Sequence, residues 1–402
     1  MVAQRAAQYG DRTTVVLSEK CRAGSPESSS PPGHRPSLRH VPDPRHRAFR
    51  DRHRLADILV IALSAVLSGA RSWDAIADFG LTKEAWLRSI GLELPNGIPS
   101  HDTFNRIFAA LDPRAFQHCF SSWINAACHA LGFRHIPIDG KAVRGSAGPD
   151  GTCLHLVSAW AAEHRLSLAQ VAVADKSNEI TAIPELLKML DLHGALVSID
   201  AIGCQKDIAR QIREEGGDYL LAVKDNQPTL YADVRACFLL AYDKEFEGVK
   251  HEIFTSREVG HGRHEERTYT VLYELDGLST RQEWVDLRAV VQVIRVRREG
   301  DRESDEVSYY ISSSTAGAAR LGEGVRGHWG IENGQHWCLD VLFGEDRCRT
   351  RQGNAAENLA WLRKMALSLF RHDNSKGSVP TRQLRAATSD DYRDHLLNLL
   401  HQ

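Results

Sequence analysis

The sequence lacks the features that would assign it to a membrane or to an oxidising compartment. Its eight cysteines contain no CxxC pair, so neither a zinc site nor a disulfide framework is indicated. The longest apolar run, residues 55–67, is too short to cross a bilayer and is interrupted by Asp57. No signal-peptide pattern is present at the N-terminus. We therefore expect a cytoplasmic protein with reduced thiols and no membrane partner.

The sequence also has little net charge, since its formal value is −2. The distribution of charge is more informative than the total. Residues 1–54 contain 11 Lys and Arg against 5 Asp and Glu, and residues 347–385 contain 9 against 2. The balance reverses over residues 225–320, with 13 against 18. Basic segments at both ends fit local contact with a polyanion, although a solvated surface explains them equally well.

The length and composition are those of an ordinary globular protein. The 402 residues suffice for two or three domains, and 42% of them are hydrophobic. Residues 1–50 are rich in Ser, Pro, Arg and His, which predicts a disordered basic arm. Residues 51–133 contain apolar residues at helical spacing, with Ser100 as a helix cap, and predict a small helical domain.

The pattern changes near residue 135. Three short apolar runs predict an antiparallel meander, and an alternation of helix and strand follows. This order is typical of an RNase H-like fold, so we expect an α/β protein whose core begins with residues 134–228. Residues 229–320 predict a β-rich insertion in which HGRHEER forms a polar turn. Residues 321–375 should supply a catalytic helix and the rest of the core, and residues 376–402 a C-terminal tail.

Two aspartates follow apolar segments of this core. Asp139 is expected at the end of the strand Ile136–Ile138, and Asp200 at the end of the strand Ala195–Ile199. If these strands are neighbours, the two carboxylates converge, which is unfavourable unless a cation neutralises them. Oxygen ligands alone suit Mg²⁺. Glu332, on a later helix, could complete a two-metal site.

A series of motifs resembles those of known proteins over about four-fifths of the chain. The stretches are, in chain order, IPSHDTFNRIF, IDGKAVRGS, HLVSAW, KSNEITAIPELL, SIDAIGCQKDIA, YLLAVKDNQ, HGRHEER, YYISS and RGHWGIENGQHWCLDVLFGEDRCRTRQGNAAENLAWLRKMAL. They resemble the DDE-class insertion-sequence transposases, in the branch that includes the H-repeat-associated proteins. The last stretch is the most specific, because such a long string of polar and aromatic residues rarely arises by chance.

The resemblance implies a fold, an activity and a set of partners. It implies an RNase H-like catalytic domain interrupted by a β domain, and metal-dependent DNA strand cleavage and transfer. Asp139, Asp200 and Glu332 map onto the family's acidic triad, which would bind Mg²⁺, with Mn²⁺ as a substitute. The expected partners are transposon ends and target DNA, on which the protein would assemble as a homodimer. The expected location is the nucleoid of a bacterial cytoplasm.

The chain departs from the wider family pattern at several positions. Related transposases often carry a Tyr, Arg, Glu, Lys signature on the catalytic helix. Here Val325, His328 and Leu339 replace the Tyr, Arg and Lys. The sequence reads KDNQ at the end of the predicted strand YLLAVK, where family members commonly read KGNQ. These departures leave the three acidic residues intact.

Several other residues near the triad are candidates for contact with DNA, and each is also compatible with an ordinary surface position. They are Lys141, Arg144, Lys224, Arg263, Arg267, His328, Arg347, Arg349 and Arg351. The last three alternate in an irregular stretch and would face one way if that stretch were extended. We expect Trp329 and Trp337 in the core, with base stacking as the alternative.

Three other functions are compatible with parts of the sequence. A decayed or domesticated transposase would bind DNA without cleaving it, but loss of an acidic residue would be its mark, and all three are present. A metal-dependent hydrolase of small substrates would not need basic ends. A zinc hydrolase could use His328, Glu332 and His336, which follow one another at four-residue intervals, but the HExxH pattern is not matched.

Overall fold

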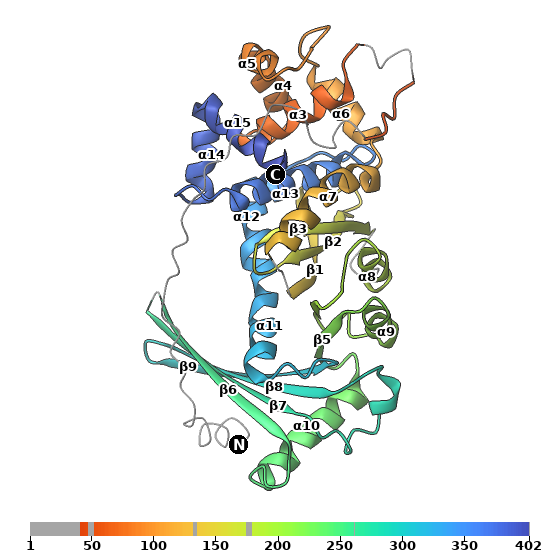
Figure 1. The fold of residues 1–402 in the computed structure, drawn as a ribbon, viewed down its shortest axis with the longest axis vertical. Coiled ribbons are helices and arrows are strands. Elements are labelled where there is room, and N and C mark those ends of the chain that lie inside the picture. The colour runs from red at the N-terminus through yellow and green to blue at the C-terminus, as the bar shows by residue number, and fades with distance from the viewer. Residues whose placement is uncertain (1–40, 47–51, 132–134, 174–178, 261, 402) are drawn as a thin grey trace. The chain divides into compact units, whose positions relative to one another are not determined.

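The computed structural model describes the greater part of the chain, shown in Figure 1. The described residues are 41–46, 52–131, 135–173, 179–260 and 262–401. Most of the predicted basic arm therefore lies outside them. The described residues form two compact units, one spanning residues 192–327 and the other combining residues from 34–191 with 328–402. No helix in these ranges combines the length and apolarity needed to cross a membrane.

The sheet of the second unit is the predicted antiparallel meander. It consists of β1 (His135–Val143), β2 (Leu154–Ala161) and β3 (Leu166–Val173), with β2 in the centre. Pairing of β1 with β2 continues from Ile138 to Val143. Asp139 therefore lies within the strand, opposite Ser158, and the expectation that it ends the strand was wrong. The ladder of backbone hydrogen bonds extends the strand past the point where its apolar pattern stops.

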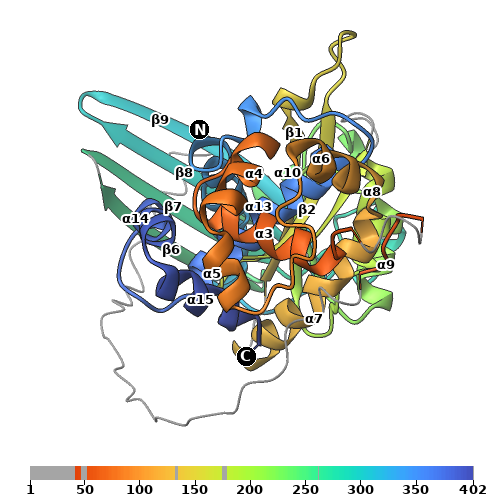
Figure 2. The same cartoon turned by 90° about the horizontal axis from the view of Figure 1, so that it is seen from above.

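The helical region before this sheet packs against a helix from the other end of the chain. Its helices are α3 (Leu55–Leu67), α4 (Trp73–Thr82), α5 (Glu84–Ser89), α6 (His101–Ala110) and α7 (Pro113–Leu131). As predicted, the Ser100 hydroxyl caps α6 by accepting the N–H of Thr103 at 3.4 Å. Helices α3, α6 and α7 contact α13 (Ala355–His372), which is buried along most of its length (Figure 2). The region thus belongs to the same compact unit as the C-terminal helices.

The C-terminal residues, predicted as a tail, instead form two helices, α14 (Val379–Thr388) and α15 (Asp390–Asn398), followed by the turn η7 (Leu399–His401). Ser378 and Ser389 cap their N-termini. The buried Arg393 of α15 stacks on Trp86, 4.4 Å from the ring centroid. The apolar pattern of this segment is weak because the long side chain of Arg393 occupies part of its buried face. Sequence periodicity therefore did not predict these helices.

The predicted helical stretch from residue 316 to residue 370 is broken twice. Helix α11 (Ala318–Gly330) continues into a π-helical segment, η5 (Ile331–His336), and then into α12 (Trp337–Val341). The chain next follows an irregular path up to α13, with one short turn, η6 (Glu345–Arg347). The remaining elements of the second unit are η2 (Arg144–Ser146) and α8 (Glu179–Leu187).

The first unit begins with the predicted alternation of strand and helix. β4 (Leu196–Ile199) pairs in parallel with β5 (Asp218–Val223), and α9 (Lys206–Glu214) provides the crossover. The predicted β-rich insertion starts with a helix, α10 (Pro228–Asp243), which the sequence reading did not anticipate. Four long strands and the turn η4 (Arg281–Glu283) follow. The strands are β6 (His251–Gly260), β7 (Arg263–Leu272), β8 (Ala289–Glu299) and β9 (Arg302–Ser312).

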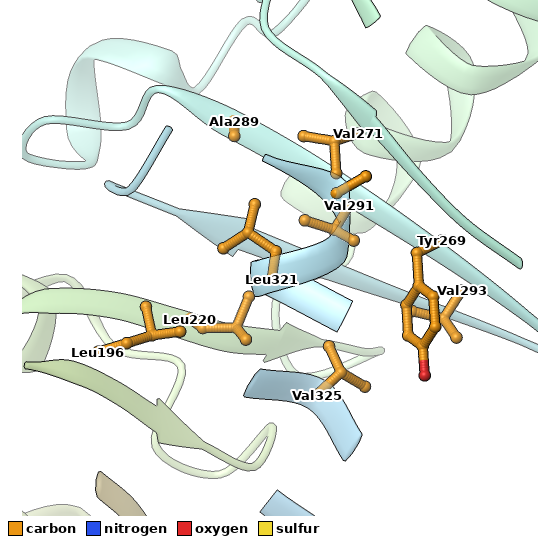
Figure 3. Packing of buried hydrophobic residues seen from close by; sticks show 10 residues of the cluster. Leu196, Leu220, Tyr269, Val271, Ala289, Val291, Val293, Leu321 and Val325 are labelled. Carbon is orange, nitrogen blue, oxygen red and sulfur yellow. The ribbon is translucent and has the colours of Figure 1, made fainter. Parts of the chain in front are cut away.

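These four strands are antiparallel, and β9 also pairs with β5, so the chain returns to the strand from which it departed. The segment HGRHEER was predicted as a polar turn, but from Arg263 onward it is strand β7. Polar residues occupy both faces of this strand end, which removes the alternation by which a strand is detected. Figure 3 shows Leu321 and Val325 of α11 packed with Val291 and Leu220 in the core of this unit.

Candidate active site

Asp139 lies beside the π-helical segment that carries Glu332. The Nδ1 atom of His336 is 3.4 Å from Oδ2 of Asp139, and η5 packs against β1. Burial, together with the nearby positive charges of Lys364 and Lys141, lowers the pKa of His336 to about 3. The imidazole is therefore neutral at physiological pH. Glu332, four residues earlier, is exposed.

Three elements hold the π-helical segment against the sheet. A Cβ atom at Gly330 or at Gly334 would lie 2.8 Å from the indole ring of Trp160 on β2, so glycine permits the close approach. The buried Gln335 accepts a hydrogen bond of 2.8 Å from Ser167 on β3. The guanidinium group of Arg371, on α13, donates to the carbonyl oxygen of Gly334. π-Helical turns are frequent at functional sites, where they re-aim side chains within a helix.

Asp200 directly follows β4, as predicted, and its carboxylate is oriented by the loop that it begins. Oδ1 accepts the backbone N–H groups of Ile202 at 3.1 Å and of Gly203 at 3.4 Å. The KDNQ segment supports the same loop, because Asn226 and Gln227 donate to the carbonyl oxygens at its two ends. The sequence had marked this motif only as a family departure, and its partners were not predictable from spacing.

Asp139 and Glu332 belong to one compact unit and Asp200 to the other. Across the described residues, no group of three or more His, Cys, Asp or Glu side chains is arranged to hold a metal ion. The convergence of the three carboxylates therefore stays a prediction.

Lys141, a candidate for DNA contact, is enclosed by carboxylates. Its ammonium group contacts Asp340 and lies 2.5 Å from Oε2 of Glu345 and 4.0 Å from Oδ1 of Asp346. Because its side chain is only 11% exposed, a phosphate group would have to compete with these partners. We therefore do not propose Lys141 as a contact to DNA. The same contacts engage Asp340, Glu345 and Asp346, the acidic residues that follow Glu332 in the sequence.

The remaining predicted cations differ in how available they are. Arg144 and Lys224 are exposed, and His328 is half-buried. Arg263 lies 3.9 Å from Glu299. Arg267 is buried, and its guanidinium group contacts Glu265 and lies 3.3 Å from Glu258. A phosphate contact by Arg267 would have to displace two carboxylates, and the DNA role of this strand end stays a prediction.

The arginine row that follows α12 has the alternation that the sequence indicated. Arg347, Arg349 and Arg351 are exposed, whereas the intervening Cys348 and Thr350 are half-buried. The row lines a hollow of about 520 Å³.

The expectation that two tryptophans near Glu332 are core residues was wrong. Trp329 is 41% exposed and Trp337 is 54% exposed. The π-helical segment changes the register between α11 and α12, so that regular helical spacing does not identify the buried face of this stretch. Trp160, which lies under this stretch and is 2% exposed, was not identified as part of the site. Its short apolar strand gave no sign of the helix that would cover it.

The sequence matches the models of a known protein family. Residues 130–369 match the model described as "Transposase DDE domain", and residues 36–124 match the model described as "DDE_Tnp_1-associated". The chain therefore belongs to the DDE-class insertion-sequence transposases, in the branch of the H repeat-associated proteins. The sequence resemblance is confirmed.

Relatives match nearly along their full length. The chain is 38% identical to the "H repeat-associated putative transposase YhhI" of Escherichia coli K12 over 90% of its own length and 95% of that protein. It is 47% identical to the "Uncharacterized protein in dhlA 3'region" of Xanthobacter autotrophicus over 71% of its own length and 96% of that protein. A solved piggyBac transposase synaptic complex with hairpin DNA aligns over 85% of this chain and 72% of that chain. Its TM-score is 0.37 at 8% identity, too low to define a shared fold.

Proposed function

We propose that the protein cleaves DNA strands at the ends of an insertion sequence and joins them to target DNA. In this proposal Asp139, Asp200 and Glu332 are the catalytic residues of an RNase H-like core. The observation that carries the proposal is the placement of η5. The segment bearing Glu332 packs on the strand bearing Asp139, in a chain that belongs to the DDE family.

The three residues have the chemistry that a hard divalent cation requires. They supply only carboxylate oxygens, which suit Mg²⁺, with Mn²⁺ as a substitute. When bound, such ions would neutralise the carboxylates and stabilise the attacking and leaving oxygens of a phosphodiester displacement. The chain's own groups orient the ligands: the N–H groups of Ile202 and Gly203 fix Asp200, and neutral His336 lies against Asp139 without adding positive charge.

The test uses the full-length chain and duplex DNA from the two flanks of its own gene, incubated with Mg²⁺ or with a chelator. Asp139→Asn, Asp200→Asn and Glu332→Gln should each reduce strand cleavage by at least about a hundredfold, because ion-based stabilisation contributes several kcal/mol to the barrier. Binding of the same DNA in chelator should remain, since the amides preserve shape.

Glu323→Gln is the matched control, because Glu323 is an exposed carboxylate on the preceding helix, paired with Arg320 at 3.2 Å. It should cleave like the unmodified chain. Mg²⁺-dependent cleavage by the Glu332→Gln protein would assign the third ligand elsewhere. DNA binding without cleavage by the unmodified chain would instead support a decayed transposase.

A further inference from the structure

A cluster of positive charge lines the hollow at the arginine row, within the second unit. The hollow measures about 520 Å³, and two stretches distant in sequence contribute four arginines to it. Arg71 comes from the loop between α3 and α4, and Arg347, Arg349 and Arg351 come from the segment between α12 and α13. Among the described lining residues, Asp74 is the single acidic one. The hollow therefore carries an excess of positive charge.

The four guanidinium groups have no internal counterion: none forms an ion pair with a carboxylate of the described chain. Arg71 donates to the carbonyl oxygen of Leu342 at 3.0 Å, which ties its side chain to the segment that carries the arginine row. Several exposed arginines elsewhere are paired, among them Arg257 with Glu266 and Arg298 with Glu303, each at 2.6 Å. Like charges gathered without counterions repel one another, so an external anion would be bound favourably here.

The geometry of the row selects a repeating anion. Arg347 ends the turn η6, and the backbone is extended from Cys348, where φ is −79° and ψ is 119°. Side chains at every second residue of an extended chain repeat at roughly 6.6 Å, and Arg347, Arg349 and Arg351 are the exposed residues of this stretch. A single small anion would satisfy one or two of these groups, whereas a phosphodiester backbone presents a charge at each nucleotide. Gly344 adopts φ +64°, and a Cβ there would lie 3.2 Å from Cδ of Arg71, so the turn at this glycine admits Arg71 to the hollow.

We infer that this hollow binds the phosphodiester backbone of duplex DNA, with the arginine row following one strand and Arg71 adding a contact from the loop between α3 and α4. The inference rests on the proposed function, because that function makes DNA the substrate. It adds a second contact region, separate from the three carboxylates, that positions the duplex without taking part in strand cleavage. Such contacts set register and affinity but carry no sequence information directly.

The test measures DNA affinity by fluorescence anisotropy, with chelator present, over a salt series from about 50 to 200 mM. The full-length chain is compared with the triple variant Arg347→Ala, Arg349→Ala, Arg351→Ala and with Arg71→Ala. Each lost phosphate contact lowers the slope of log affinity against log salt by about one. The triple variant should therefore lose up to about three units of slope, and Arg71→Ala about one.

Two further variants test whether the change in slope depends on the positive charge of the row, on the shape of the arginine side chain or on net charge alone. Replacing the three row arginines by lysine should preserve most of the slope, because lysine still neutralises a phosphate. The matched control removes Arg257, Arg281 and Arg298 together. These are three exposed arginines of the first unit, each paired with a carboxylate of that same unit. It removes the same charge and should change the slope by less than one unit.

The outcomes distinguish this inference from the proposed function. A triple variant that binds DNA with the affinity and slope of the control would overturn the inference, even if the unmodified chain cleaves its substrate. Conversely, the triple variant could lose slope while the unmodified chain never cleaves DNA. That result would support DNA binding at the hollow and contradict the proposed strand cleavage. An equal loss in the triple variant and the control would reduce the effect to net charge and also overturn the inference.

Discussion

Lys141 lies two residues after Asp139, and its surroundings decide what the side chain can do. Burial alone would lower the pKa of Lys141, but Glu345 and Asp340 outweigh it and raise the pKa, so the ammonium stays charged. Burial would likewise raise the pKa of Glu345, but Lys141 and Arg363 lower it. This buried pair ties β1 to the chain beyond Glu332, so Lys141 acts as a positioning residue.

Replacing Lys141 by Met should lower the free energy of unfolding by about 3 kcal/mol, because removal of one partner leaves a buried carboxylate uncompensated. Arg144→Met is the matched control: Arg144 is three residues further on, with a side chain 82% exposed, and its loss should cost less than about 0.5 kcal/mol. Chemical denaturation measures both. Adding Glu345→Gln to Lys141→Met should restore part of the loss. Equal stability of the two single variants would show that the pair is not structural.

At the scale of elements, the π-helical segment η5 depends on contacts that its own sequence does not specify. Trp160 contributes the surface on which Gly330 and Gly334 lie, and the guanidinium carbon of Arg371 lies over that indole, 5.7 Å from the ring centroid. The strand, the π-helical turn and α13 therefore form one packed stack. Because the indole is buried and covered, it cannot easily move to admit a larger residue.

Gly334→Ala should destabilise the protein by about 1–3 kcal/mol, since its Cβ would lie 2.8 Å from Trp160. It should also reduce strand cleavage, because Glu332 lies two residues earlier on the same turn. Gly260→Ala is the matched control, as nothing lies within 4 Å of its added Cβ. Thermal unfolding and the cleavage assay measure the two effects. If Gly334→Ala matched Gly260→Ala in both, the tight packing of η5 would have no consequence.

At the scale of the whole molecule, Asp373 links the end of α13 to the C-terminal helices. Its buried carboxylate accepts hydrogen bonds from Ser375 at 2.5 Å, Tyr392 at 2.5 Å and His395 at 3.2 Å. Burial by itself would raise the pKa of Asp373, but the bonds from Ser375 and Tyr392 hold it at about 2, below the usual 3.8. A carboxylate with a depressed folded-state pKa stabilises the protein above its unfolded pKa, and that stabilisation is lost as pH falls toward 2.

Asp373→Asn should therefore reduce the loss of unfolding free energy that occurs as the pH falls. Between about pH 5 and pH 2 the unmodified chain should lose about 2 kcal/mol of unfolding free energy that the variant does not lose, because the amide does not titrate. At neutral pH the variant should be the less stable of the two. Asp391→Asn, an exposed site at the start of α15, should retain the pH dependence. A variant curve parallel to that of the unmodified chain would contradict the role given to Asp373.

The amino-acid sequence by itself determined the order of elements from β1 to β5, the cap of α6 and the family. These depend on local information: apolar runs set the backbone hydrogen-bonding pattern, side chains cap nearby N–H groups, and motifs keep their order along the chain. Asp200 after β4 was predictable for the same reason.

Only the tertiary structure decided which charges are internal and which are free. Lys141 and Arg349 are both cations beside the candidate site in sequence, yet one is enclosed by Glu345 and the other has no carboxylate partner in the described chain. Partners distant in the sequence make that difference, as they do for the π-helical turn that packs on Trp160 and for α15, whose Arg393 packs on Trp86. Burial and pairing are properties of the assembled chain, because the free energy of a charge depends on everything that surrounds it in space.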